Sequence, residues 1–236
     1  MPSPPPPKAQ HSSPVPPVRI GRALGRSRLT AVVAGTVAVL VLACDLTLAW
    51  IGEMTDMRRA ILSVVALCTL GGLAKWDWPS LGLGLRVQPN LRYWLKATVV
   101  IGALVLLFCV IVFTAIWFLA PATVQEQLWG APSDFWRWIP HACLVTPLLE
   151  ETIYRFTLCM VGVALLGRWP TIVLSGLLFA GLHVAYGNPS PENFIAGFVL
   201  AWAYVKSENL LVPIALHSMG NLVVGLWNLG CVVLGG

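Results

Sequence analysis

The segment Pro147-Leu148-Leu149-Glu150-Glu151-Thr152-Ile153-Tyr154-Arg155 places two adjacent carboxylates and an arginine in a stretch that is otherwise largely apolar from Trp138 to Leu166. A charged side chain at the centre of a membrane costs at least about 2.5–3.5 kcal/mol on insertion scales. Three such side chains within six residues are therefore an expensive arrangement. Charges of this kind mark a functional site by default, so Glu150, Glu151 and Arg155 are the first candidate site residues.

The composition of the 236-residue chain is typical of a membrane protein. It is 57% hydrophobic and 11% charged, with a mean hydropathy of +0.78, whereas soluble domains carry about 25% charged residues. A spanning helix needs about 20 apolar residues. The apolar runs therefore predict an all-α, polytopic transmembrane helix bundle of about seven spans, with residue ranges 29–51, 60–74, 97–119, 138–166, 171–186, 194–205 and 210–233.

The first 28 residues combine a proline-rich segment with basic side chains. Residues 1–18 contain eight prolines, so residues 1–28 are predicted to be a disordered tail. Basic residues before the first apolar run favour a cytoplasmic N-terminus, and the net charge of +5 is read as topology rather than as affinity for nucleic acid. Val41-Leu42-Ala43-Cys44 resembles a lipoprotein cleavage box, but apolar sequence continues to Ile51, which favours an uncleaved span.

The predicted domain organisation is simple. Residues 29–137 form the N-terminal spans and residues 138–233 form a core that carries the candidate site. Asp45 is a lone acid in the first span and is expected to be interfacial or to pair helices. The six cysteines are scattered through apolar runs without a CxxC pair, so they are interpreted as buried small side chains.

Few polar residues occur in the last four predicted spans, and their spacing is orderly. Glu151 and Arg155 are four residues apart, so on a helix they share a face and can form an ion pair. Glu150 lies about 100° round the same helix. His217 and Asn221 repeat the four-residue spacing, as do Phe179 and His183. His141 adjoins Pro140 and a tryptophan-rich segment, and is interpreted as interfacial.

A spare glutamate with two histidines supports general-base hydrolysis. A carboxylate beside an imidazole can take a proton from water, and an imidazole and an amide on one helix face can stabilise an oxyanion. Glutamate and two histidines are also a possible zinc set, although HExxH is absent. A serine mechanism is weaker, because Ser175 lacks the first glycine of a GxSG motif and Ser218 points off the face of His217.

Glu150-Glu151-x-x-x-Arg155, Phe179-x-x-x-His183 and His217-x-x-x-Asn221 follow one another on separate apolar segments. This order resembles the CAAX protease and bacteriocin-processing family of glutamate-type intramembrane proteases, over roughly residues 138–226. The resemblance implies that Glu150 is the catalytic glutamate and that His183 helps it to activate water. It also implies that His217 and Asn221 stabilise the oxyanion and that Glu151 and Arg155 support the site.

The same resemblance implies no metal cofactor, with zinc as the alternative. The expected substrate is a membrane-associated protein or peptide, such as a sorting tail, a leader or a CAAX-like end, and the expected location is the bacterial inner membrane. Partners other than this substrate and the lipid bilayer are not expected, and nucleic acid is excluded as one. Two other functions stay open from the residues: a non-catalytic immunity or scaffold protein on the same fold, and a transporter with a proton relay. The absence of repeat halves disfavours the transporter.

Overall fold

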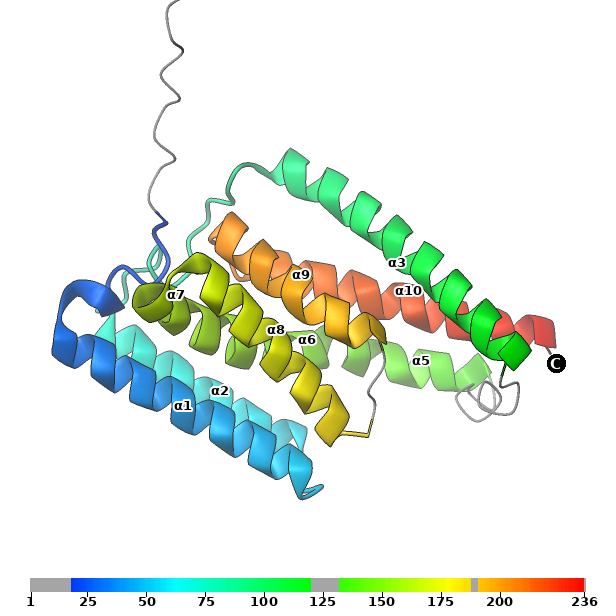
Figure 1. Cartoon of the computed structure of the whole chain (residues 1–236), viewed down its shortest axis with the longest axis horizontal. Coiled ribbons are helices and arrows are strands. Elements are labelled where there is room, and N and C mark those ends of the chain that lie inside the picture. Colours follow the sequence, from blue (N-terminus) through cyan, green and yellow to red (C-terminus); the bar gives the residue numbers. More distant parts are fainter. Residues whose placement is uncertain (1–17, 120–131, 188–190, 236) are drawn as a thin grey trace, which may run out of the picture.

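The computed structural model describes residues 18–119, 132–187 and 191–235, and these ranges contain helices and connecting turns but no strand (Figure 1). Where the connections between helices are described, they are short turns, except for residues 74–90 between α2 and α3. Their bounds are α1 Arg28–Trp50, α2 Asp56–Leu73, α3 Leu91–Leu119, α5 Pro132–Pro140, α6 Thr146–Glu151, α7 Met160–Leu166, α8 Arg168–Ala185, α9 Pro191–Ser207 and α10 Leu211–Gly235.

Four helical segments within these ranges are long and apolar enough to cross a membrane. They are Arg28–Trp50, Leu91–Val112, Arg168–Ala185 and Leu211–Gly230. Two other helices do not qualify. Helix α9 is too short, with 17 residues, and α2 carries three charged side chains, Asp56, Arg58 and Arg59, in its first turn. The prediction of an all-α polytopic bundle of about seven spans is confirmed.

The run from Pro132 to Leu166 is one helical rod with two irregular stretches (Figure 1). Two π-helical segments, η2 His141–Val145 and η3 Thr152–Cys159, lie on either side of α6. The rod ends at Gly167, whose φ of 83° lies in the left-handed region that glycine adopts readily. Because π-helical turns are frequent at functional sites, their position beside the two glutamates favours a functional site there.

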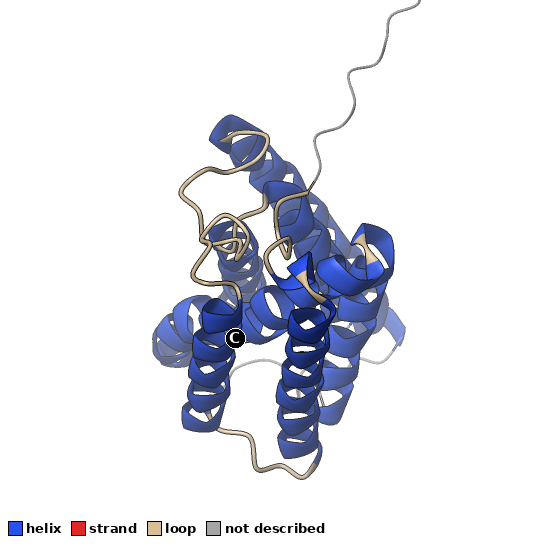
Figure 2. Cartoon of the chain, turned by 90° about the vertical axis from the view of Figure 1, so that its left-hand side faces the viewer, coloured by secondary structure: helices blue, strands red, loops and turns tan. Residues whose placement is uncertain are grey.

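The bundle packs around this rod (Figures 1 and 2). Helices α1 and α2 lie together against η3. Helix α9 also contacts η3, and α10 contacts η2 and α6. Helix α8 packs closely on α9, because Gly197 lies against the backbone of Gly176. Helix α3 lies on the outside, against α10 and α9, and none of its apolar window is buried.

The predicted disordered tail of residues 1–28 needs a correction at its end. Residues 1–17 lie outside the described residues, but from Val18 onward the chain packs on the bundle. Arg19 donates from its backbone and from Nε to the carboxylate of Glu208, at 2.8 and 2.7 Å, and Leu24 is fully buried. The prolines stop before this segment, which has apolar side chains and a partner at the end of α9.

Gly21 fits this docked segment because it lacks a side chain. Its φ is +73°, and a Cβ there would overlap the carbonyl oxygen of Met160. Gly52 has a similar φ of +71°, but nothing lies within 4 Å of the equivalent position.

We expect Gly21→Ala to lower the melting temperature in detergent more than Gly52→Ala does. Both variants force alanine into the left-handed region, at about 1–2 kcal/mol, but only the first adds a backbone overlap. Each further kcal/mol corresponds to about 2–4 °C for a chain of this size. Equal shifts for the two variants would show that the N-terminal segment is not docked in this way.

Candidate active site

The two glutamates of the opening segment lie at the centre of the bundle. Glu150 is 4% exposed and Glu151 is fully buried, both at the end of α6. Arg155 follows on η3 and is also fully buried. The structure therefore places the three charges in the protein interior, where an unpaired charge is strongly destabilising.

Glu151 and Arg155 form the ion pair that their spacing predicts. Arg155 Nε lies 3.0 Å from Glu151 Oε2, although the N–H does not point along this line. Arg155 Nη2 donates to the carbonyl of Gly197 at 3.5 Å, and the guanidinium lies 4.7 Å from the centroid of the Phe179 ring. Arg155 thus joins the rod to α8 and α9.

His217 reaches both glutamates from α10. Its Nδ1 lies 2.9 Å from Glu151 Oε1, and its Nε2 lies 4.0 Å from Glu150 Oε2. Because a carboxylate can only accept, Nδ1 carries the proton in this contact. Nε2 is then an acceptor in the neutral ring and donates only when the imidazole is protonated.

Glu150 has one oxygen without a hydrogen-bonding partner among the described residues. This oxygen, Oε2, is buried and faces the imidazole of His217. A buried carboxylate oxygen normally has a partner, so an unpartnered one is available to a water molecule or a substrate. This oxygen is therefore the atom of the site best placed to accept a proton from water.

His183 lies on the last turn of α8, close enough to Glu150 to interact with it electrostatically. Its Nδ1 donates to the carbonyl of Phe179 at 3.0 Å, which leaves Nε2 as an acceptor in the neutral ring. The Phe179 ring lies between the two histidines, with centroid distances of 4.5 Å to His183 and 6.0 Å to His217. The structure thus brings His183, His217 and Glu150 into one site.

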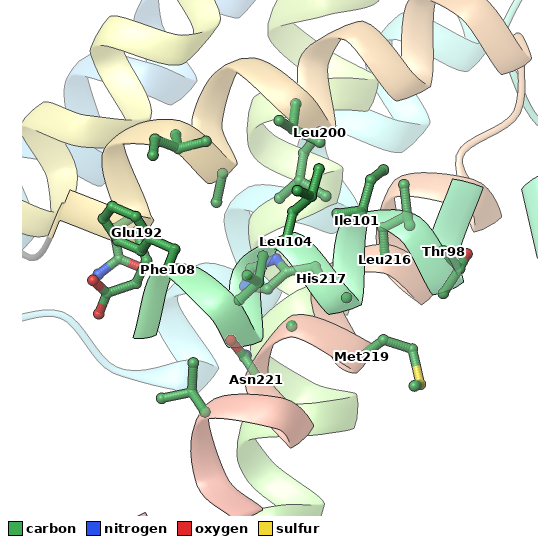
Figure 3. Close-up of a pocket in the computed structure, with 18 of the residues that line it drawn as sticks. Thr98, Ile101, Leu104, Phe108, Glu192, Leu200, Leu216, His217, Met219 and Asn221 are labelled. Carbon is green, nitrogen blue, oxygen red and sulfur yellow. The ribbon is translucent and has the colours of Figure 1, made fainter. Parts of the chain in front are cut away.

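Asn221 lies one turn beyond His217 on α10, and its Nδ2 donates to the carbonyl of Ala142 at 2.6 Å. The acceptor belongs to the π-helical segment η2. His217 and Asn221 also line an apolar cavity of about 330 Å³, whose other walls come mainly from α3, α9 and α10 (Figure 3). The face that both residues share therefore borders a space large enough for part of a substrate.

Sequence reasoning missed two charged residues of the site. Arg59 on α2 donates from Nη1 to Glu150 Oε1 at 2.7 Å, and Asp45 on α1 accepts from Arg59 Nε at 3.0 Å. The predicted second span began one residue after Arg59, which made the arginine look like a flanking residue. Opposite charges on neighbouring spans are the signal that could have paired them.

The buried charges do not cancel. Three carboxylates, of Asp45, Glu150 and Glu151, face two guanidiniums, of Arg59 and Arg155. One negative charge is therefore left over unless a histidine or a carboxyl group takes up a proton. A protonated His217 would balance the set and present N–H groups from both ring nitrogens.

The remaining sequence-derived candidates have ordinary structural contacts. Ser175 donates to the carbonyl of Tyr154 and Ser218 to that of Ile214, so each hydroxyl serves helix packing. His141 lies at the surface, 2.8 Å from Asp56. In the described part of the chain, no group of three His, Cys, Asp or Glu side chains is arranged to hold a metal ion.

Comparison with known proteins agrees with this geometry. Residues 132–223 match the family described as Rce1-like, type II CAAX prenyl endopeptidase Rce1-like. The matched residues run from the start of α5 into α10 and contain Glu150, Glu151, Arg155, His183, His217 and Asn221. Over these residues the chain is similar to this family of proteases, in line with the resemblance to the CAAX protease and bacteriocin-processing family. Searches of curated proteins and of solved structures found no match.

We expect Arg155→Met to destabilise the protein strongly in detergent, because removing one partner leaves a buried carboxylate unpaired, at about 3–5 kcal/mol. Adding Glu151→Gln to this variant should recover part of the loss. The control is Arg58→Met, whose partner Glu53 is exposed and whose pair is worth about 0–1 kcal/mol. Thermal unfolding of the four proteins measures this, and equal losses for the two arginines would contradict the buried pair.

Proposed function

We propose that the protein is an intramembrane endopeptidase in which Glu150 activates water. The observation that carries this proposal is the buried, unpartnered Oε2 of Glu150, with His217 and His183 beside it. The similarity of residues 132–223 to a family of proteases supports the same conclusion.

The proposed reaction needs only residues of this chain and water. Glu150, with His183, takes a proton from a water molecule, and the hydroxide attacks the carbonyl carbon of the scissile peptide bond. The carbonyl oxygen becomes an oxyanion, which accepts hydrogen bonds from His217 Nε2–H and the Asn221 amide. The intermediate collapses when the C–N bond breaks, and the leaving nitrogen takes the proton that Glu150 holds.

Glu151 and Arg155 support this chemistry indirectly. Glu151 accepts from His217 Nδ1 and so fixes the orientation of the imidazole beside Glu150. Arg155 compensates the charge of Glu151 and holds it against α9 through Gly197. This leaves Glu150 as the carboxylate whose free oxygen can act.

We propose a membrane-associated peptide segment as the substrate. The cavity beside His217 and Asn221 is lined mainly by apolar side chains, among them Ile101, Leu104 and Leu216 (Figure 3). Such walls suit an apolar sorting tail, leader or CAAX-like end, whose carbonyl would enter on the side of the two donors. Helix α3 forms one wall of this cavity.

We propose that catalysis does not use a metal ion. Glu150 Oε1 is occupied by the Arg59 guanidinium at 2.7 Å, and Glu151 Oε1 is occupied by His217. A cation placed between the two glutamates would be repelled by Arg59. One oxygen of each glutamate is therefore already engaged with another group of the chain.

We propose the bacterial inner membrane, with the N-terminus in the cytoplasm, as the location of the chain. Basic residues gather at one end of the bundle. They lie before and at the start of α1, between α2 and α3, at the start of α3, at the α7–α8 turn and at the end of α9: Arg19, Arg22, Arg26, Arg28, Lys75, Arg86, Arg92, Arg168 and Lys206. By the positive-inside rule this end faces the cytoplasm. Asp45, Arg59 and His183 lie near the other end of their helices, so the site is expected to open away from the cytoplasm.

We expect a variant with Glu150→Gln to lose proteolysis while still inserting in the membrane. The native gene would be replaced, and peptide termini in the membrane fraction would be compared by quantitative mass spectrometry. New termini that depend on the wild-type chain should disappear, because glutamine cannot accept the proton. Ser218→Ala is the control and should keep them.

Persistence of every terminus in Glu150→Gln, with an unchanged phenotype, would instead favour a non-catalytic scaffold or immunity protein.

We expect alkaline phosphatase to be active when inserted in the α1–α2 turn at Gly52, and inactive when inserted at Gly167 in the α7–α8 turn. The enzyme folds only outside the cytoplasm, because it needs disulfides. The reverse pattern would place the catalytic end in the cytoplasm and contradict the proposed orientation.

A further inference from the structure

Arg59 brings a positive charge to the candidate base from outside the family-matched segment. It is 5% exposed, and it lies 91 residues before Glu150 in the sequence. Its Nη1 donates to Glu150 Oε1 at 2.7 Å, a short charge-assisted hydrogen bond. The N-terminal spans thus contribute directly to the site, although residues 132–223 carry all the motif residues.

Arg59 is itself held in place by Asp45 and by the Tyr186 ring, and Tyr154 in turn fixes Asp45. Asp45 accepts from Nε at 3.0 Å and from Nη2 at 3.4 Å, so the two planar groups face each other. The Tyr154 hydroxyl donates to Asp45 Oδ2 at 3.1 Å, and the Arg59 guanidinium lies 5.2 Å from the Tyr186 ring centroid. The planar guanidinium of arginine can bond to Asp45 and Glu150 at the same time in a fixed geometry, whereas the ammonium of lysine is a single point charge.

The consequence for Glu150 is an asymmetry between its two oxygens. Oε1 is fixed by Arg59, and Oε2 is left without a hydrogen bond, 4.0 Å from His217 Nε2. Arg59 therefore fixes the carboxylate in an orientation that turns its free oxygen toward the histidines. Its charge also allows Glu150 to stay ionised in a buried place where a lone carboxylate would be neutralised.

We propose that Arg59, oriented by Asp45, is a positioning residue that holds Glu150 as a carboxylate with its free oxygen aimed at the water-binding side. This inference rests on the proposed function, in which Glu150 is the base. In this proposal Arg59 acts through Glu150 and not on the substrate. The alternative is that the network only ties α1 and α2 to the rod, and then the state of Glu150 would not depend on Arg59.

The first test reads the charge of Glu150 without requiring activity. Infrared difference spectra of the full chain in lipid nanodiscs, with and without Glu150→Gln, isolate the signal of this carboxyl group. In the wild type the difference should show a carboxylate band. In the Arg59→Gln background it should show a protonated carboxyl band, because the compensating charge is gone.

The control is Arg58→Gln, which removes the neighbouring arginine of the same helix, whose pair with Glu53 is exposed. It should give the wild-type difference spectrum. A carboxylate band that persists in Arg59→Gln, or a protonated Glu150 in the wild type, overturns the proposal. If Arg59→Gln does not fold, the double variant Asp45→Asn/Arg59→Gln replaces it. Loss of Arg59 leaves Asp45 and Glu150 unpaired, and the double variant removes the first of these carboxylates, so the infrared signal of Glu150 can still be read.

The second test measures turnover of the membrane substrate identified from the lost termini. Arg59→Lys keeps the charge but cannot hold Asp45 and Glu150 with one rigid fork. It should lower kcat by roughly 10- to 100-fold, the effect of a displaced catalytic group, with KM unchanged. An unchanged kcat overturns positioning. If the infrared result is as expected but the wild type cleaves nothing, the proposed function fails and the ionic role of Arg59 stands.

Discussion

The need to compensate buried charge in an apolar bundle is the constraint on which the rest of the structure depends. Glu150, Glu151, Asp45, Arg59 and Arg155 are all nearly or fully buried. An ion removed from water is tolerated only with close partners. These partners come from α1, α2 and the central rod, so the charges require these helices to lie together.

The same constraint separates two carboxylates that are adjacent in sequence. Glu151 lies against Arg155 and His217, whereas Glu150 is bonded to Arg59 through Oε1 and has no hydrogen bond to Oε2, which lies 4.0 Å from His217 Nε2. Two neighbouring carboxylates with different surroundings can take different roles. The irregular helical segments on either side of α6 belong to this arrangement, since η2 supplies the Ala142 carbonyl that holds Asn221.

Much of this could be predicted from the sequence, because apolar runs and four-residue spacings are local signals. They gave the helical class, the Glu151–Arg155 pair and the shared face of His217 and Asn221. Arg59 could not be found in this way, since its partner Glu150 is remote in sequence and Arg59 lies at a helix start. Asp45 was expected to be interfacial or to pair helices; it is buried and pairs α1 with α2, but its partner and its place beside the site depend on tertiary packing. The docked segment that begins at Val18 was not predicted, because the prolines before it and the basic residues within it are typical of a disordered tail.

The central claim is that Glu150 is a base that acts without a metal ion. The most direct measurement is cleavage of the identified membrane substrate by the purified chain in nanodiscs, in the presence of a strong chelator, with wild type and Glu150→Gln compared. The account predicts that the wild type cleaves at the same rate with and without chelator and that Glu150→Gln does not cleave. Cleavage by Glu150→Gln, or loss of wild-type cleavage on chelation that added zinc restores, would contradict it.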